Sequence, residues 1–279
     1  MTKNKSFTSN KPLVYLIATP IGNLKEFTDR AKHVVLECDL VACEDTRNTS
    51  SLLNKFNISK PTFSLREHNE KAASETLINK IKSGTKVVYM SDAGYPGISD
   101  PGSIFVKECI ANDINVSIIN GSSAFLSCLL ASGLDTSHFY FYGFLSPKNN
   151  EAIKELNAMK DREETLIFYE APHRIKDTLK VIYNVLGNRK AVIGRELTKL
   201  NEEFIRGTLE ELSNIDDDSL IGEMVIVVEG NKIQNELPLD DINEAIDLLK
   251  SKGLTNRDII EIISKIYKVN KNQISKILY

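Results

Sequence analysis

The sequence of 279 residues predicts an α/β protein with two domains, followed by a small helical unit. Two patterns lead to this fold class. Short apolar runs alternate with helical patterns over residues 13–134, and strand candidates outnumber helices over residues 135–230. A polar stretch at residues 231–238 then precedes a purely helical pattern. We therefore expect one boundary near residues 134–138 and another after Gly230.

The first domain is expected to contain a mostly parallel sheet. Apolar runs typical of buried strands occupy residues 14–19, 40–43, 61–65, 86–90 and 115–119. Helical spacing occupies residues 27–38, 70–83, 101–112 and 123–132. Strands and helices thus alternate along this domain, and parallel neighbours need such crossover connections.

The second domain is expected to contain a mixed sheet. Its strand candidates lie at residues 139–142, 165–169, 191–193, 203–206 and 224–228. Two long helical segments, residues 149–160 and 175–186, separate them. Because this leaves too few crossover helices for a parallel sheet, some strands should pair antiparallel.

The C-terminal unit, residues 231–279, is predicted to contain a linker and two or three short helices. Helical spacing and capping signals are carried by Ile242, Ala245, Ile246 and Leu249, by Thr255 to Asp258, and by Asn270 to Gln273. This pattern resembles a helix-turn-helix. Residues 250–279 contain seven basic and two acidic side chains, a net charge of +5. Two interpretations remain open, a solvated helical unit and an RNA-binding appendage.

Composition narrows the class of protein. The hydrophobic share of 42% and charged share of 26% are typical of a globular domain. The net charge is -3, whereas a simple nucleic-acid-binding protein is expected to have a positive net charge. Residues 1–12 are expected to form a flexible N-terminus without the apolar segment of a signal peptide. No apolar run approaches the roughly 20 residues of a membrane helix, so we expect a cytoplasmic protein that does not bind a membrane.

A metal site is not expected. The four cysteines form no CxxC pair, and the four histidines form no HExxH motif. The cysteines lie among apolar or helix-like neighbours. They are interpreted as buried thiols in a reducing compartment.

Two loops that follow predicted strands are candidates for ligand binding. The sequence contains neither GxGxxG nor a P-loop. Residues 19–23 instead form a rigid turn with Pro20 and Gly22, and residues 91–102 contain three glycines and two prolines. Ligands of open α/β sheets bind outside the carboxyl ends of strands, so the second loop is expected to bind one. The alternative is a structural loop that starts the next helix.

Charged segments at other strand ends complete a series of six motifs. In order, they are Ala18-Thr-Pro-Ile-Gly-Asn23, Glu44-Asp-Thr-Arg47, Ser91-Asp-Ala-Gly94, Ile98-Ser-Asp-Pro-Gly102, Phe168-Tyr-Glu-Ala-Pro-His-Arg174 and Arg195-Glu-Leu-Thr-Lys199. This series closely resembles the ribosomal small subunit methyltransferase I family of the tetrapyrrole-methylase, or class III, superfamily. The resemblance covers about residues 13–230, and the basic tail resembles the C-terminal helical domain of the family. One departure is Gly121-Ser-Ser-Ala124, where the family often has Gly-Pro-Ser-Ala.

The resemblance implies a bilobal fold with two αβα lobes and a small C-terminal helical domain. It implies that S-adenosylmethionine binds in the cleft between the lobes, without a metal, and that the protein is a homodimer. The implied reaction is 2′-O-methylation of a cytidine ribose in 16S rRNA, near the decoding centre of the small ribosomal subunit.

We assign expected roles to residues on this basis. The expected cofactor contacts are Pro20, Gly22, Ser91, Asp92, Ala93, Gly94, Ser99, Asp100, Ser122, Tyr169, Leu197 and Thr198. The expected RNA contacts are Arg47, His173, Arg174, Lys199, Lys265, Lys268 and Lys271. A ribose hydroxyl needs a proton acceptor, and the candidates are Glu44, Asp45, Glu170 and Glu196.

The catalytic role stays open among these four carboxylates. Glu44 and Asp45 are equally suited to holding Arg47, and Glu170 to pairing with Arg174. Two other functions also remain open. One is methylation of a tetrapyrrole or a protein side chain within the same superfamily, against which the Glu44–Arg47 motif and the basic tail argue. The other is a non-catalytic RNA-binding or assembly factor.

Overall fold

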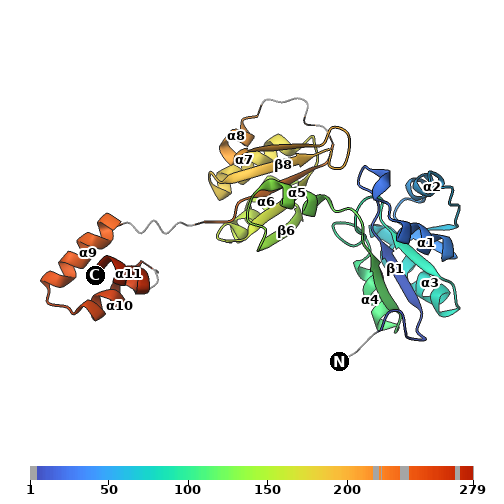
Figure 1. The fold of residues 1–279 in the computed structure, drawn as a ribbon, viewed down its shortest axis with the longest axis horizontal. Helices are drawn as coiled ribbons and strands as arrows, with labels where there is room; N and C mark the ends of the chain where they lie inside the picture. The colour runs from blue at the N-terminus through green and yellow to red at the C-terminus, as the bar shows by residue number, and fades with distance from the viewer. Residues whose placement is uncertain (1–4, 216–219, 221, 233–238, 268–270, 279) are drawn as a thin grey trace. The chain divides into compact units, whose positions relative to one another are not determined.

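The computed structural model describes residues 5–215, 220, 222–232, 239–267 and 271–278. The chain forms two compact units, residues 1–230 and residues 231–279 (Figure 1). The larger unit contains two five-stranded sheets, one in each half. This arrangement confirms the α/β fold class with a C-terminal helical region.

The first sheet is parallel and has the strand order β3-β2-β4-β1-β5. Its strands are β1 (Leu13–Ile17), β2 (Leu40–Cys43), β3 (Thr62–Ser64), β4 (Val87–Met90) and β5 (Asn115–Ile119). All five strands were predicted, because each is an apolar run flanked by polar turns. Their carboxyl ends lie at one edge of the sheet, as in any parallel sheet.

Helices cover both faces of this sheet. Their bounds are α1 (Asp29–Glu37), α2 (Thr46–Asn54), α3 (Glu70–Lys82) and α4 (Ser103–Ala111), with short 3-10 turns η1 (Leu24–Glu26) and η2 (Glu67–Asn69). On one face, Leu77 of α3 and Phe105 of α4 join a buried cluster with Leu16 of β1. On the other face, α1 and α2 pack against the neighbouring β1 residue, Ile17. Successive residues of β1 thus point to opposite faces, as the pleat requires.

The second sheet is mixed, in agreement with the prediction. Its order is β6-β7-β10-β8-β9, and its strands are β6 (Phe139–Phe144), β7 (Thr165–Glu170), β8 (Lys190–Arg195), β9 (Glu203–Thr208) and β10 (Met224–Val228). The pair β6–β7 is parallel, and the three remaining pairs are antiparallel. The central strand β10 is buried along its whole length.

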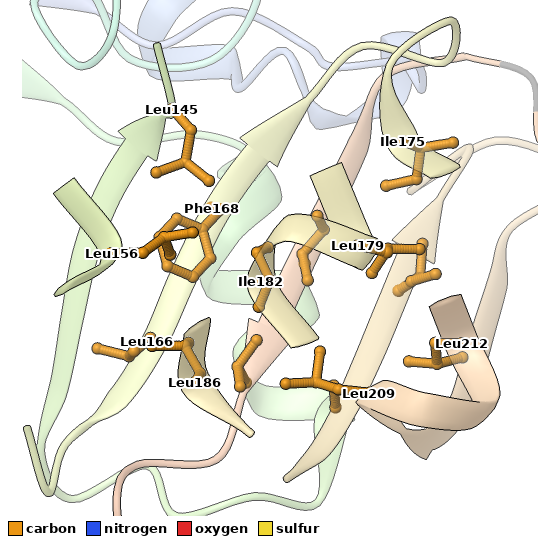
Figure 2. Close-up of a cluster of buried hydrophobic side chains, with 14 of the residues drawn as sticks. Leu145, Leu156, Leu166, Phe168, Ile175, Leu179, Ile182, Leu186, Leu209 and Leu212 are labelled. Atoms are coloured by element: carbon orange, nitrogen blue, oxygen red, sulfur yellow. The ribbon is translucent and has the colours of Figure 1, made fainter. Parts of the chain in front are cut away.

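Helices cover the second sheet on both faces too. The helices α6 (Asn149–Met159), α7 (Ile175–Leu186) and α8 (Leu209–Ser213) pack on one face. Figure 2 shows this core, to which Leu179 and Ile182 of α7 and Phe168 of β7 contribute. On the other face, Cys128 of α5 (Ala124–Ser132) packs against Val225 of β10. The helix α5 thus precedes the boundary expected near residues 134–138 but packs on the second sheet.

Two helices of the larger unit were not predicted. The first, α2, is rich in Thr, Asn and Ser, which favour caps and turns over helix interiors. Its signal was the preceding Asp45, whose carboxylate accepts a hydrogen bond from the Arg47 backbone N–H. The second, α8, has five residues and begins with a capping box of Thr208 and Glu211.

The described part of the N-terminal segment contacts the first lobe. The Phe7 ring stacks on Tyr15, with 6.5 Å between ring centroids. The Asn115 side chain donates to the Ser9 hydroxyl at 2.6 Å. These contacts hold residues 7–9 against β1 and β5.

The C-terminal unit consists of α9 (Leu239–Ser251), α10 (Asn256–Ile266) and α11 (Lys271–Leu278). Isoleucines from all three helices form its core, namely Ile242, Ile246, Ile259, Ile263 and Ile274. The predicted cap at Thr255 is present, because its hydroxyl accepts from the Asp258 backbone N–H. The predicted cap at Asn270 lies outside the described residues. In the ranges that the structure describes, no helix has the length and apolar character needed to cross a membrane.

Candidate functional site

A cavity of about 430 Å³ lies between the two lobes, at the carboxyl ends of strands from both sheets. Residues that follow β2, β4 and β5 form one wall. The other wall comes from the ends of β6, β7 and β8 and the start of β10. Its lining includes Glu44, Asp92, Ala93, Gly94, Ser99, Asp100, Phe144, Tyr169, Glu196, Leu197, Lys199 and Glu223.

The two loops expected to bind a ligand are joined to each other. The Thr19 N–H donates to the Gly94 carbonyl at 2.8 Å, and the Gly94 N–H donates back at 3.1 Å. The Thr19 hydroxyl also donates to the Ser91 carbonyl at 3.2 Å. Gly94 has φ +73°, a left-handed conformation that glycine adopts without steric cost. Residues 19–23 and 91–102 therefore present one continuous backbone surface.

Buried side chains hold the far end of the 91–102 loop. The Glu70 carboxylate accepts from the backbone N–H groups of Gly102, Ile104 and Phe105, at 2.9, 2.8 and 3.2 Å. These are orphan donors at the start of α4, so Glu70 caps that helix from a distance in sequence. The buried Tyr89 hydroxyl donates to the Pro101 carbonyl at 2.6 Å. The role of Glu70 was not predicted, because in the sequence it is only the first residue of a helical pattern.

Asp92 connects this loop to the Glu44–Arg47 motif. Its carboxylate accepts from the Asp45 backbone N–H at 3.2 Å and from the Asn48 side chain at 2.7 Å. Both donors lie at the start of α2. The cavity residue Asp92 thus holds the helix that carries Arg47.

The opposite wall contains an unusual backbone segment. Glu196 and Thr198 have φ values of +50° and +67°, which cost non-glycine residues on the order of 1–3 kcal/mol each. The Lys199 ammonium pairs with Glu196 at 2.8 Å. A Cβ atom on Gly22 would lie 2.5 Å from the Lys199 Cγ, so glycine permits the close approach of the two lobes. The buried Thr198 Oγ1 has no hydrogen-bond partner among the described residues.

Two carboxyl groups of the cavity have altered acidity. Burial raises the pKa of Asp100 to about 7, with further contributions from the charges of Glu44, Asp92 and Glu223. Burial also raises the pKa of Glu44, and the charge of Asp92 adds to the effect. The cavity therefore concentrates negative charge, which a cationic ligand would relieve.

The geometry separates the four proton-acceptor candidates. Glu44 and Glu196 line the cavity. Asp45 instead caps α2, and the Arg47 guanidinium holds the pKa of that carboxyl well below its usual range. The Asp45 carboxylate therefore has little basicity. It holds Arg47 in place, which is one of the two roles that the sequence left open for it.

Glu170 is a second candidate that the geometry does not favour as a base. Its side chain is 1% exposed. The carboxylate accepts from the Ala171 N–H at 2.8 Å and from the Thr178 hydroxyl at 2.6 Å, and it pairs with Arg174 at 3.5 Å. These contacts link the end of β7 to the first turns of α7. Glu170 is thus the structural partner of Arg174, the alternative that the sequence left open.

The expected cofactor residues also fall into two groups, those that line the cavity and those that do not. Asp92, Ala93, Gly94, Ser99, Asp100, Tyr169 and Leu197 line the cavity. Pro20, Gly22, Ser91, Ser122 and Thr198 lie outside its lining and shape the loops around it. The Ser122 hydroxyl donates to the Glu26 carboxylate. This bond holds the turn in which the chain departs from the family pattern.

Several cavity residues were not among the expected contacts. They are Ile21, Tyr95, Ile98, Ser123, Ala124, Phe125, Phe144, Glu223, Met224 and Val225. Glu223 could have been predicted from the position of strand ends. It precedes β10, which runs antiparallel to β7, so the start of β10 lies beside the carboxyl end of β7. The aromatic residues Tyr95, Phe125 and Phe144 follow no such rule, because aromatic side chains also fill the cores of both lobes.

The expected RNA contacts differ in accessibility. Arg47 has a side chain that is 86% exposed, and His173 is also exposed. Arg174 is half-buried and donates to the carbonyls of Leu145 and Ser146, so its guanidinium holds the end of β6. This structural role argues against Arg174 as an RNA contact.

The expected RNA contacts of the C-terminal unit lie partly within the described residues. Lys265 and Lys271 are exposed, and Lys265 pairs with Glu261 at 2.9 Å. Lys268 lies outside the described residues.

Comparison with known proteins identifies the family of the chain. A family model described as Tetrapyrrole (Corrin/Porphyrin) Methylases matches residues 13–213. A relative from Bacillus subtilis (strain 168), called ribosomal RNA small subunit methyltransferase I, is 41% identical over 263 residues, covering 91% of this chain and 89% of its own. The chain belongs to the ribosomal RNA small subunit methyltransferase I family. This membership confirms the resemblance carried by the six motifs.

The family relationship extends through the C-terminal unit. A methyltransferase I from Streptococcus pyogenes serotype M18 is 40% identical over 280 residues, covering 98% of both chains. One from Vibrio cholerae serotype O1 is 39% identical and covers 99% of this chain and 97% of its own. The tetrapyrrole-methylase match ends at residue 213, so the helical unit is shared with these relatives beyond that match.

Solved structures share the fold at low sequence identity. Diphthine synthase matches with a TM-score of 0.59 and 18% identity, covering 78% of this chain and 89% of its own. Uroporphyrin-III C-methyltransferase from Thermus thermophilus, complexed with S-adenosyl homocysteine, matches with a TM-score of 0.54 and 17% identity, covering 77% and 96%. Both matches confirm that the larger unit of this chain has the class III methyltransferase fold.

Proposed function

We propose that the protein transfers a methyl group from S-adenosylmethionine to the 2′-hydroxyl of a cytidine in 16S rRNA, near the decoding centre of the small ribosomal subunit. The name shared by its relatives supports a small-subunit rRNA substrate. The six motifs support the 2′-O chemistry through their family resemblance. The single structural observation that carries the proposal is the acidic cavity between the lobes.

The residues of the cavity fit this cofactor. Bound S-adenosylmethionine supplies a methyl group that a positively charged sulfonium makes electrophilic. Glu44, Asp92 and Asp100 on one wall and Glu196 and Glu223 on the other give the cavity a negative charge that complements that cation. The Thr198 hydroxyl, buried beside the lining residues Leu197 and Lys199, offers an unused polar group for a cofactor atom.

Glu44 is the proton acceptor in this proposal. It lines the cavity, and its raised pKa gives it more basicity than an ordinary carboxylate. Asp45 is too acidic and Glu170 is buried in structural contacts, while Glu196 is paired with Lys199. Glu44 would orient the ribose hydroxyl and accept its proton as the new bond forms.

RNA recognition is assigned to exposed basic side chains. Asp45 fixes the Arg47 guanidinium with bonds of 2.9 and 3.3 Å, which prepares it to grip a phosphate. On the other lobe, the exposed Lys199 lines the cavity, and the exposed His173 follows the end of β7. The basic C-terminal unit would add phosphate contacts that depend on salt concentration.

The homodimer implied by the resemblance finds support in α5. Leu126 and Leu130 lie one turn apart on this helix and are 39% and 72% exposed. Neighbouring apolar side chains at i and i+4 form a stripe suited to a self-complementary interface. Because ribosomal subunits are the substrate, we place the enzyme in the cytoplasm.

The test is methyl incorporation into unmodified small-subunit particles with labelled cofactor. The product nucleoside should be 2′-O-methylcytidine by mass spectrometry. Glu44→Gln should lower the single-turnover rate about 10²–10⁴-fold while cofactor affinity stays within a few-fold of wild type. The exposed Glu37, which contacts His33, provides the matched control Glu37→Gln. Methylation of a base, a tetrapyrrole or a protein in place of the ribose would refute the proposal.

A further inference from the structure

An extra residue in β6 changes which face its last side chain occupies. Phe141 pairs with Ile167 of β7, but the next pairs are Gly143 with Phe168 and Phe144 with Tyr169. Tyr142 is therefore the additional residue of a β-bulge. Without it, strict alternation would place Phe144 on the face opposite Phe141.

The bulge thus brings Phe144 to the cavity. Phe141 and Tyr169 belong to the cluster beneath α5, whereas Tyr142 and Phe168 contribute to the core beneath α7. Through its pairing with Tyr169, Phe144 joins the first face and lines the cavity. Gly143 makes the bulge feasible, because it has φ +87°.

The ring of Phe144 is supported on one side and accessible from the cavity. Its centroid lies 5.5 Å from that of Tyr169, and Tyr169 in turn contacts Phe141 edge-on at 5.1 Å. The exposed fraction of Phe144 is 46%, although an aromatic side chain gains free energy by burial. A backbone irregularity that leaves a large ring accessible beside a cavity indicates contact with a ligand.

The charges around this ring restrict the kind of ligand. Asp100, Glu223, Glu44 and Glu196 line the same cavity. Lys199 also lines it and pairs with Glu196, so the carboxylates dominate its charge. These carboxylates repel a phosphate, so the part of an RNA that enters is expected to be its base and ribose. Proteins read unpaired RNA by stacking splayed bases on aromatic rings.

We propose that Phe144, supported by Tyr169, is the platform on which an unstacked nucleobase of the RNA substrate rests. The inference depends on the proposed function and adds to it the binding subsite of the base. In this arrangement the ring orients the nucleotide so that its ribose faces the carboxylates. Phe144 is a substrate-binding residue, and Tyr169 is a positioning residue that holds it.

The test compares Phe144→Ala and Phe144→Trp with the matched control Phe139→Ala. Phe139 lies on the same strand and is also exposed, but it is outside the cavity lining. Phe144→Ala should raise the KM for small-subunit particles about 10- to 100-fold, as expected for loss of one stacked base. Phe144→Trp should restore most of the affinity because it keeps a flat aromatic face. Phe139→Ala should change neither KM nor kcat.

Cofactor affinity, measured separately by calorimetry, distinguishes the alternatives. Phe144→Ala should leave it within about twofold of wild type, since the ring does not contact the cofactor in this arrangement. A parallel loss of cofactor affinity would overturn the inference, because the ring would then stack on the cofactor adenine. An unchanged KM would overturn it as well. If the wild-type protein methylates no RNA, the proposed function fails, and particle binding without turnover still decides the role of Phe144.

Discussion

Replacing Asp100 with asparagine should stabilise the protein and weaken its binding of the cofactor. Burial raises the pKa of Asp100 from its ordinary value of 3.8 to about 7, so ionisation of this carboxyl opposes folding at neutral pH. The full difference corresponds to about 4 kcal/mol. Because Asp100 lies at a cavity wall that water can reach, we expect about 1–2 kcal/mol of this free energy to be recovered.

The sign of the pH dependence follows from the raised pKa. Above pH 7 the folded wild-type protein carries the charged carboxylate, so the advantage of Asp100→Asn is fully present there. As the pH falls, the folded carboxyl takes up a proton before the unfolded one does, and the advantage shrinks. It should disappear near pH 3, where the carboxyl is largely protonated in both states.

Thermal unfolding at pH 8 and pH 5 measures this effect. The Tm gain at pH 8 should be about 3–6 °C and should be clearly smaller at pH 5. Asp29→Asn is the matched control, because the Asp29 side chain is fully exposed and does not line the cavity. A Tm gain of Asp100→Asn that is independent of pH would show that ionisation is not its cause.

Ligand binding supplies the second measurement. At pH 8, Asp100→Asn should lower the affinity for S-adenosylmethionine about tenfold, about 1.4 kcal/mol, since an anion facing a cation is lost. Its affinity for S-adenosylhomocysteine, whose sulfur is neutral, should fall less. Equal losses for the two ligands would refute the electrostatic reasoning, because a change in shape would then explain both.

Four further outcomes are expected. Glu70→Ala should lower the free energy of unfolding by about 2–3 kcal/mol and weaken cofactor binding, since three backbone N–H donors lose their acceptor. Unchanged cofactor affinity would show that the 91–102 loop keeps its conformation without the Glu70 carboxylate. Gly94→Ala should weaken cofactor binding, because the φ of +73° at this position costs alanine about 1–2 kcal/mol. Calorimetry measures the cofactor affinity, at a temperature where the variant and the wild type are both folded. Glu170→Ala should destabilise the fold by about 3–5 kcal/mol by leaving Arg174 partly buried and unpaired, while residual folded enzyme keeps its cofactor affinity. Deleting residues 231–279 should preserve cofactor binding and remove a salt-dependent part of RNA affinity, and equal RNA affinity at all salt concentrations would contradict this.

The strands of both sheets could be predicted from sequence because most of them are short apolar runs between polar turns. Helix α2 could not, since its polar composition suggests a loop and its stability comes from Asp45, Asp92 and one buried face. The positions of the strand ends predicted where the cavity lies. Only the contacts in the structure distinguish the carboxylates that line it from those with structural roles. Glu170 differs from Glu44 only in the groups that it meets, such as the Thr178 hydroxyl eight residues away.

The position of Phe144 illustrates a deeper limit of sequence reading. The face of a strand residue follows from pairing with its neighbour, and an added residue reverses the alternation. The bulge depends on the pairing of β6 with β7, which are separated by α6. Periodicity within residues 139–144 alone predicts the opposite face. Gly143 was the available signal, because glycine within a strand often marks a bulge.

The bonds of Asp92 lead us to expect that the two substrates of the proposed reaction do not bind independently. One carboxylate anchors the loop expected to meet the cofactor and the first turn of the helix that carries Arg47. We therefore expect ordering of the loop by the cofactor to change the orientation of the Arg47 guanidinium, which is proposed to contact the RNA. Coupling free energies are reciprocal, so RNA must alter the affinity for cofactor by the same factor as cofactor alters the affinity for RNA. If Asp92 and Arg47 act as proposed, a single side chain lets each site respond to whether the other is filled.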